Sequence, residues 1–289
     1  MCQGADEACV GAPRAAIAWE GDPGMNDAVR SRGPRAIAIF VAIGLLSGFL
    51  SGLFGVGGGT VIVPLLVMLA AFGQKLASGT SSAAIIPTAA VGVVSYAVHG
   101  DVDWVAALLL AAGAVVGAQV GTRLLHRLSE SFLRWFFVGF LVVVMASLFV
   151  IIPSRDAELE LHFWSGAALV VTGLVTGVLS GLIGVGGGIV VVPVLILLFG
   201  ASDLVAKGTS LLMMIPTTIS GTIGNIRHRN VDLAAGLGIG IAACVTTPLG
   251  AVVANAVDPQ VANILFVVFL VVITAQMTQR AIRASRRGR

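Results

Sequence analysis

Charged side chains are scarce in this chain, and their scarcity excludes an ordinary soluble domain. Only 11% of the 289 residues are Asp, Glu, Lys or Arg, whereas 57% are hydrophobic. Soluble domains carry roughly 25% charged residues, because polar groups must cover their apolar core. Apolar runs of about 18 residues or more recur along the sequence, and each is long enough to cross a hydrocarbon core of roughly 30 Å. The composition therefore predicts an all-α membrane protein.

Several chemical motifs are also missing, and each absence removes a class of function. Cys2, Cys9 and Cys244 are too few and too scattered to indicate a disulfide framework or a metal cluster. The glycine-rich runs lack the Lys-Ser/Thr pair of a phosphate-binding loop, and no βαβ pattern surrounds them. Neither a Gly-x-Ser-Gly motif with a partner His nor paired aspartates occur in the apolar segments. We therefore expect no enzymatic activity, no cofactor, no metal and no nucleic-acid partner.

An internal repeat is the most informative feature that the sequence does contain. Residues 44–69 return 129 residues later as residues 173–198, with 17 of 26 positions identical. The same offset relates Gly79-Thr80-Ser81 to Gly208-Thr209-Ser210, and Pro87 to Pro216. Duplication on this scale indicates one fold built from two homologous halves.

Each half contains five apolar segments, so about 8–10 transmembrane helices are expected. The second segment of each half, at 59–73 and 188–201, is short, follows three glycines and contains a proline. Such a segment either crosses fully or forms one limb of a broken or re-entrant helix. The predicted organisation is a cytoplasmic leader at 1–35, membrane repeats at 36–153 and 163–279, an extracytoplasmic linker at 154–162 and a basic cytoplasmic tail at 280–289. The leader lacks the apolar core of a secretory signal peptide.

The positions of the basic connectors predict that the two repeats are inverted. Arg227 and Arg229 follow the third segment of the second half, whereas the matching connector of the first half has no Lys or Arg. The next connector reverses this pattern, with Arg123 and Arg127 in the first half only. Basic connectors lie in the cytoplasm, so both termini are expected there as well. Inverted repeats are typical of secondary transporters.

The glycine triplets are the first candidate site. Three consecutive glycines cost helix stability, and unwound backbone in a bilayer is tolerated only against protein or a water-filled cavity. Free N–H groups and the positive end of the following helix would bind an anion near the membrane middle. The candidate residues are Gly57, Gly58, Gly59, Gly186, Gly187 and Gly188. The simpler interpretation, close helix packing, is preferred for Gly48, Gly52, Gly177 and Gly181.

A second candidate set opens the third segment of each half. It comprises Ser78, Thr80, Ser81, Lys207, Thr209 and Ser210, whose hydroxyl and ammonium groups could bind an anion. N-capping of a helix explains Thr80 and Thr209 equally well. Lys207 is a functional candidate because a lysine within the bilayer is costly, although it could instead snorkel to the interface beside Asp203.

Four further polar residues carry weaker signals. Asn225 and Gln119 lie within or near the spans, where they could line a pathway or simply pair with the backbone. His99 and His228 occupy equivalent connectors and are expected to be solvated; a role in proton coupling is the alternative.

The doubled glycine block, followed by Val-Pro and then Gly-Thr-Ser, resembles the sulfite exporter TauE/SafE family over about residues 37–279. The resemblance implies a multi-pass permease of the bacterial inner membrane for sulfite, sulfonates or related sulfur anions. The residues themselves indicate only a small anion. We therefore expect a secondary transporter working by alternating access with export favoured, and a passive anion channel is the alternative. Proton or other ion coupling and the oligomeric state stay open.

Overall fold

The computed structural model describes residues 33–150 and 163–287, and these residues form helices joined by short connectors. The predicted linker at 154–162 and nearly all of the predicted leader lie outside the described residues. The helices of the first half are α2 (Pro34–Phe54), α3 (Gly59–Leu69), α4 (Gln74–Ala97), α5 (Trp104–Arg127) and α6 (Glu130–Val150). Those of the second half are α7 (Phe163–Ile183), α8 (Gly188–Phe199), α9 (Asp203–Arg227), α10 (Leu233–Ala256) and α11 (Pro259–Arg287).

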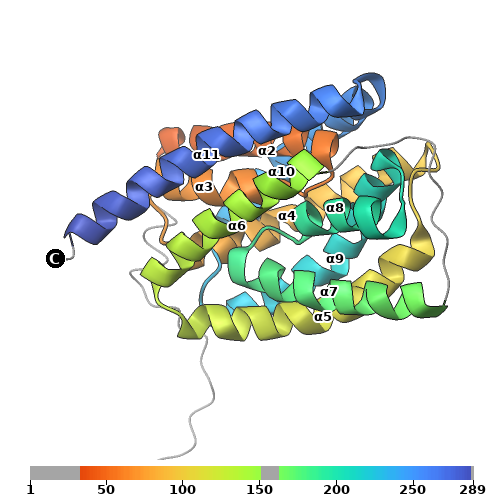
Figure 1. Cartoon of the computed structure of the whole chain (residues 1–289). Helices are drawn as coiled ribbons and strands as arrows, with labels where there is room; N and C mark the ends of the chain where they lie inside the picture. The colour runs from red at the N-terminus through yellow and green to blue at the C-terminus, as the bar shows by residue number, and fades with distance from the viewer. Residues whose placement is uncertain (1–32, 151–162, 288–289) are drawn as a thin grey trace, which may run out of the picture.

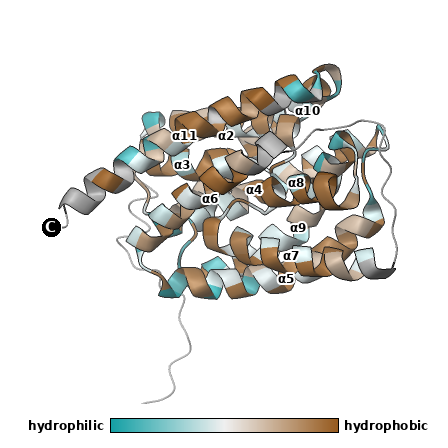
Figure 2. Ribbon diagram, viewed as in Figure 1, coloured by the Kyte–Doolittle hydropathy of each residue, from teal (hydrophilic) through white to brown (hydrophobic). Residues whose placement is uncertain are grey.

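The prediction of an all-α membrane protein is confirmed. Within the described residues, five helices are long and apolar enough to cross a membrane: α2, α4, α5, residues 165–183 of α7, and α10. Large apolar side chains face outward along them, and Figure 2 shows brown along the helices with teal gathered near their ends. Leu108 and Val245, for example, expose 67% and 66% of their surface, which suits contact with lipid.

The short second helix of each half cannot cross the bilayer. α3 and α8 contain 11 and 12 residues. At 1.5 Å per residue they are only about 16–18 Å long, well short of a hydrocarbon core of roughly 30 Å. Each begins at the last glycine of its triplet, Gly59 or Gly188, whereas the preceding helix ends earlier, at Phe54 or Ile183. The glycine-rich break therefore lies between the two helices, and the second of them begins inside the protein.

The packing of the helices does not follow the division of the sequence into two halves. α2 packs along α10, and α7 packs along α5, in the most extensive contacts of the fold. Figure 1 shows α5 beside α7 at one side of the molecule, with α4 and α9 between them and α2. Since α4 also packs on α10, and α9 on α5, the first bundle is α2, α3, α4 and α10, and the second is α5, α7, α8 and α9. Each bundle therefore takes one helix from the other half.

Glycines allow α10 and α5, the helices that come from the other half, to approach their neighbours closely. A Cβ added to Gly48 would lie 2.6 Å from the Cα of Ala243, and one added to Gly177 would lie 2.6 Å from the Cα of Ala114. Gly52 and Gly181 face backbone atoms of α10 and α5 in the same way. The packing interpretation of these four glycines is confirmed.

The two central helices, α4 and α9, run in opposite directions. Near the start of α4, the Thr80 hydroxyl accepts a hydrogen bond of 3.0 Å from the N–H of Asp232, which follows α9. The equivalent Thr209, near the start of α9, accepts one of 2.9 Å from the N–H of Asp103, which follows α4. The start of each helix therefore lies beside the connector after the other, and the two contacts are reciprocal.

Candidate functional site

Two glycine-rich turns, residues 55–58 and 184–187, break the chain at the centre of the molecule. Gly55, Gly57 and Gly58 have φ values of 67°, 70° and 76°. Their counterparts Gly184, Gly186 and Gly187 have 75°, 86° and 90°. This left-handed region is strained for residues with a side chain, so only glycine fits each turn without cost. The predicted glycine-broken helices are confirmed.

The two turns lie against each other, and each ends in a helix start. A Cβ on Gly59 would lie 2.6 Å from the Cα of Val185, and one on Gly188 would lie 3.1 Å from the Cα of Val56. The N-cap residues of α3 and α8 are Gly58 and Gly187, and neither helix start receives a side-chain hydrogen bond at its cap. Two positive helix ends therefore meet at one buried place.

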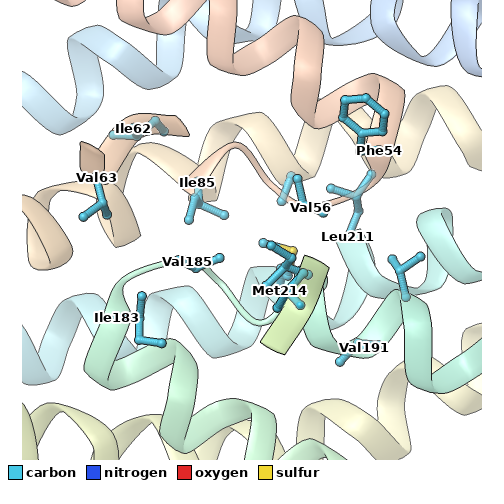
Figure 3. Close-up of a cluster of buried hydrophobic side chains, with 14 of the residues drawn as sticks. Phe54, Val56, Ile62, Val63, Ile85, Ile183, Val185, Val191, Leu211 and Met214 are labelled. Carbon is cyan, nitrogen blue, oxygen red and sulfur yellow. The ribbon is translucent and has the colours of Figure 1, made fainter. Parts of the chain in front are cut away.

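Apolar side chains fill the space between the turns. Figure 3 shows Ile85 and Met214, with Val56 and Val185, in the region between the two glycine turns. The Met214 methyl group occupies the position that a Cβ on either Gly57 or Gly186 would need. Ile85 and Met214 are equivalent under the 129-residue offset, so each half contributes one side chain to this central plug.

Two of the predicted site hydroxyls hold the turns in place. Ser81 donates a hydrogen bond of 2.7 Å to the carbonyl of Gly184, and Ser210 donates one of 2.6 Å to the carbonyl of Gly55. Each serine thus fixes the turn of the opposite half.

The alternative N-capping role of Thr80 and Thr209 is wrong. α4 begins at Gln74 and α9 at Asp203, so the N-caps are Gly73 and Ser202 and both threonines lie inside the helices. Apolar runs alone do not mark these starts, because the long apolar stretch of each helix follows Ser78-Gly79-Thr80-Ser81 or Lys207-Gly208-Thr209-Ser210. The threonines instead accept the hydrogen bonds that join the two halves.

One end of the α4/α9 pair, here called the charged end, consists of Tyr96, Asp101, Asp203 and Lys207. The Lys207 ammonium lies 2.7 Å from the Asp203 carboxylate, and their side chains are only 5% and 8% exposed. Lys207 therefore stays buried and does not snorkel to the interface. The Tyr96 hydroxyl donates a hydrogen bond of 2.6 Å to the carbonyl of Gly52. Lys207 and Asp203 therefore satisfy each other within this end.

The opposite end, here called the neutral end, consists of Gln74, Ser78, Asn225 and Asn230. These residues are the 129-residue counterparts of Asp203, Lys207, Tyr96 and Asp101. Within the described part of the chain, no hydrogen-bond partner reaches the Ser78 hydroxyl, Gln74 Oε1, Asn230 Nδ2, or either polar atom of the Asn225 amide. Asn225 and Ser78 are completely buried. Gln119, by contrast, donates to the carbonyl and hydroxyl of Ser220.

The sequence motifs missed half of the neutral end. Ser78 and Asn225 stood out as polar residues in apolar surroundings, but Gln74 and Asn230 did not. The signal that could have found them is the repeat itself. The offset aligns each of them with an acidic residue of the charged end.

Basic side chains surround the neutral end. Lys75 donates a hydrogen bond of 3.0 Å to the carbonyl of His126, and the His126 ring stacks on His228 with centroids 4.5 Å apart. Burial lowers the pKa of His228, and the neighbouring His126, Arg123 and Arg227 lower it further. His228 is therefore half-buried within a positive cluster rather than fully solvated. His99, in the equivalent connector, is exposed.

Buried glycine breaks, exposed apolar helix faces and a duplicated helical core define a polytopic membrane protein. The family model "Sulfite exporter TauE/SafE" matches residues 12–148 and 169–289. The chain belongs to this family of membrane transporters.

Curated relatives carry consistent names. The chain is 27% identical to the "Probable membrane transporter protein YunE" of Bacillus subtilis, over 86% of this chain and 99% of the relative. It is also 27% identical to the "Probable membrane transporter protein YdhB" of the same organism, over 67% and 80%. A "Probable membrane transporter protein" of Xylella fastidiosa is 29% identical over 68% and 77%. No solved structure matches the chain.

Proposed function

We propose that this protein is a secondary transporter that moves a small anion across the bacterial inner membrane by alternating access. One observation carries the proposal: the uncapped starts of α3 and α8 converge from opposite halves on one buried centre. Positive helix ends with free N–H groups are the standard way in which a protein binds an anion without buried cations. Broken helices at the centre of duplicated halves are typical of secondary transporters.

The proposed substrate is sulfite, a sulfonate or a related sulfur oxyanion, and the family name supports this choice. Export is favoured on electrostatic grounds. An anion leaving a cell that is negative inside gains about 2.3 kcal/mol per charge per 100 mV. We infer that both termini lie in the cytoplasm; the basic residues Lys75, Arg123 and Arg227, at one end of the helices, support this orientation.

The proposed site keeps the sequence-predicted residues but gives them different roles. The glycine triplets 57–59 and 186–188 supply backbone N–H groups to the anion. Ser81 and Ser210 position the two turns through their carbonyl contacts. Thr80 and Thr209 join the connectors to α4 and α9, while Ser78 and Lys207 stand at opposite ends of the path through the protein.

The reciprocal contacts support an inverted arrangement of the repeats, and they also suggest which bodies move. The bundle of α2, α3, α4 and α10 would rock against the bundle of α5, α7, α8 and α9, with the Ile85–Met214 plug between them. Rocking would open the neutral end and the charged end in turn. α4 begins at the neutral end and α9 begins at the charged end. Each opening would therefore expose the start of one of these helices to water.

Flux in liposomes tests the proposal. Purified protein is reconstituted, and uptake of labelled sulfite and sulfoacetate is measured with and without imposed pH and voltage gradients. Saturable, gradient-dependent flux is the expected result. Flux that rises linearly with concentration would instead indicate the passive channel. No flux of either compound, in protein shown to be folded, would contradict the proposed sulfur substrate.

A further inference from the structure

Unpaired polar atoms at the neutral end are the starting point for a second site. Ser78 and Asn225 are completely buried, and Gln74 is 2% exposed. Burying polar groups without hydrogen bonds is unfavourable, and native proteins rarely leave several together. None of the five unpaired atoms finds a partner among residues 33–150 and 163–287. A bound molecule that supplies the missing hydrogen bonds would remove this cost.

The chain brings these groups together where α4 begins and α9 ends. Gln74 and Ser78 are four residues apart on α4, so they share one face of the helix. A Cβ on Gly79 would overlap the carbonyl of Asn230, which shows that the start of α4 touches the connector after α9. That connector is tied to Asn225, because the N–H of Asn230 donates a hydrogen bond of 2.9 Å to the Asn225 carbonyl.

The local field at this end favours an anion. α4 begins with Gly73 as its N-cap, and no side chain forms a capping hydrogen bond at this positive helix end. At the equivalent start of α9, the Ser202 hydroxyl caps the N–H of Val205, and Asp203 supplies negative charge in the first turn. Lys75 and the His126–His228 pair lie beside the neutral end. An acidic neighbour, Glu130, lies beside Gly73, but it pairs with Arg134 at 3.2 Å.

The unpaired atoms include both donors and acceptors, and this mixture restricts the ligand. The Ser78 hydroxyl and the Asn225 and Asn230 amides donate, whereas the Asn225 and Gln74 carbonyl oxygens accept. Reversing the Asn225 amide leaves one unpaired donor and one unpaired acceptor in either orientation. A fully deprotonated oxyanion would face these carbonyl oxygens with like charge. An oxyanion that retains one acidic O–H would satisfy both kinds of group.

We propose that Gln74, Ser78, Asn225 and Asn230 form a binding site for a small, monoprotonated oxyanion at the basic end of the protein. The site is separate from the central glycine turns. It rests on the proposed function in that the ligand is taken to be the transported anion, held before it passes the Ile85–Met214 plug.

Equilibrium binding to the full-length protein in detergent tests this site without any flux measurement. The probes are hydrogen sulfite, in mildly acidic buffer, and methanesulfonate, which has the same charge but no acidic proton. Thermal stabilisation is recorded against probe concentration. Wild-type protein should be half-saturated at a clearly lower concentration of hydrogen sulfite than of methanesulfonate. Equal affinity for the two probes, or no stabilisation by hydrogen sulfite, would overturn the proposal.

Asn225→Leu is the decisive variant, because leucine has a similar size and removes both unpaired amide ends. Its half-saturating concentration of hydrogen sulfite should rise about tenfold or more, since hydrogen bonds to a charged group are lost. Its melting temperature without ligand should be unchanged or higher, which a merely structural asparagine would not allow. The matched control is Tyr96→Phe at the equivalent position of the charged end, which should bind hydrogen sulfite like the wild type.

A second variant keeps the test decisive if Asn225→Leu does not fold. Ser78→Ala removes one donor and should weaken hydrogen sulfite binding several-fold. Unchanged affinity in a folded variant would overturn the site. The flux experiment tests the transporter proposal separately. If hydrogen sulfite binding depends on Asn225 but no flux occurs, the binding site is supported and the transporter proposal is contradicted. If flux occurs but binding does not depend on Asn225, only the binding site is contradicted.

Discussion

The two ends of the α4/α9 pair share a backbone plan but differ in chemistry. At the charged end, Lys207 and Asp203 form a buried ion pair and Tyr96 bonds to the backbone of α2. At the neutral end, the same positions hold Ser78, Gln74 and Asn225. The Ser78 hydroxyl, the Gln74 carbonyl oxygen and the Asn225 side-chain amide lack partners among the described residues. The repeat therefore places equivalent positions at both ends, but only the charged end fills them with an ion pair. This difference would make the two ends of a symmetric fold unequal, and it would thereby give transport a direction.

Breaking the ion pair between Lys207 and Asp203 should cause the largest loss of stability. Lys207→Met leaves the Asp203 carboxylate buried without its partner, which we expect to cost about 3–5 kcal/mol of stability. The double variant Asp203→Gln/Lys207→Ser copies the neutral end and should recover most of this loss. Thermal unfolding of the purified proteins in detergent measures both. If Lys207→Met has the same melting temperature as the wild type, the ion pair does not stabilise the charged end.

Substitutions in the glycine turns should be equally destabilising in the two halves. Gly55→Ala and Gly184→Ala place a side chain at positive φ, and a Cβ would meet Lys207 at the first site and the Ser78 backbone at the second. Each should lose about 2 kcal/mol or more in the free energy of unfolding. Gly238→Ala is the matched control, because nothing lies within 4 Å of its added Cβ. It should be neutral or gain up to about 1 kcal/mol. Similar losses in all three variants would contradict the special role of the turns.

The threonine contacts give a direct test of the reciprocal relation. Thr80→Val removes the acceptor of the Asp232 N–H, and Thr209→Val removes that of the Asp103 N–H. Each should cost about 1–2 kcal/mol, because a partly buried N–H loses its partner. The two losses should agree closely, as measured by unfolding midpoints under identical conditions. A large loss in one variant alone would show that the two contacts are not equivalent.

Tyr96→Phe should have the smallest effect. It removes one neutral hydrogen bond to the Gly52 carbonyl and leaves the ring in place, so we expect a loss of about 0.5–1.5 kcal/mol. The melting temperature of the ligand-free protein reports this loss. A decrease as large as that of Lys207→Met would mean that the hydroxyl, rather than the ion pair, holds the charged end together.

Local patterns in the sequence were enough to predict the class of fold. Apolar runs predicted membrane helices, and the doubled glycine triplets predicted the breaks before α3 and α8, because both signals lie within one short segment. The starts of α4 and α9 could not be predicted from apolar runs, because Ser78-Gly79-Thr80-Ser81 and Lys207-Gly208-Thr209-Ser210 interrupt them. Only the burial of Gln74 and Asp203 in the structure shows that these helix starts belong to the core.

Contacts between distant segments could not be predicted. Asn225 and Gln119 look alike in the sequence, yet the Gln119 side chain bonds to Ser220, whereas the Asn225 side-chain amide has no partner among the residues described. Nor does any local pattern show that α2 packs along α10. These outcomes depend on which helices become neighbours, and that is decided by the whole fold.

The exchange of helices between the two bundles has a consequence for how the protein is made. When the ribosome has finished the first half, the Gly55 carbonyl still lacks the hydroxyl of Ser210, and α2 still lacks α10. Neither half can complete its own bundle, so the newly inserted first half must wait in the membrane for the second. Stable structure should therefore arise late in synthesis and all at once, and a chain cut between the repeats should accumulate only when both pieces are produced together.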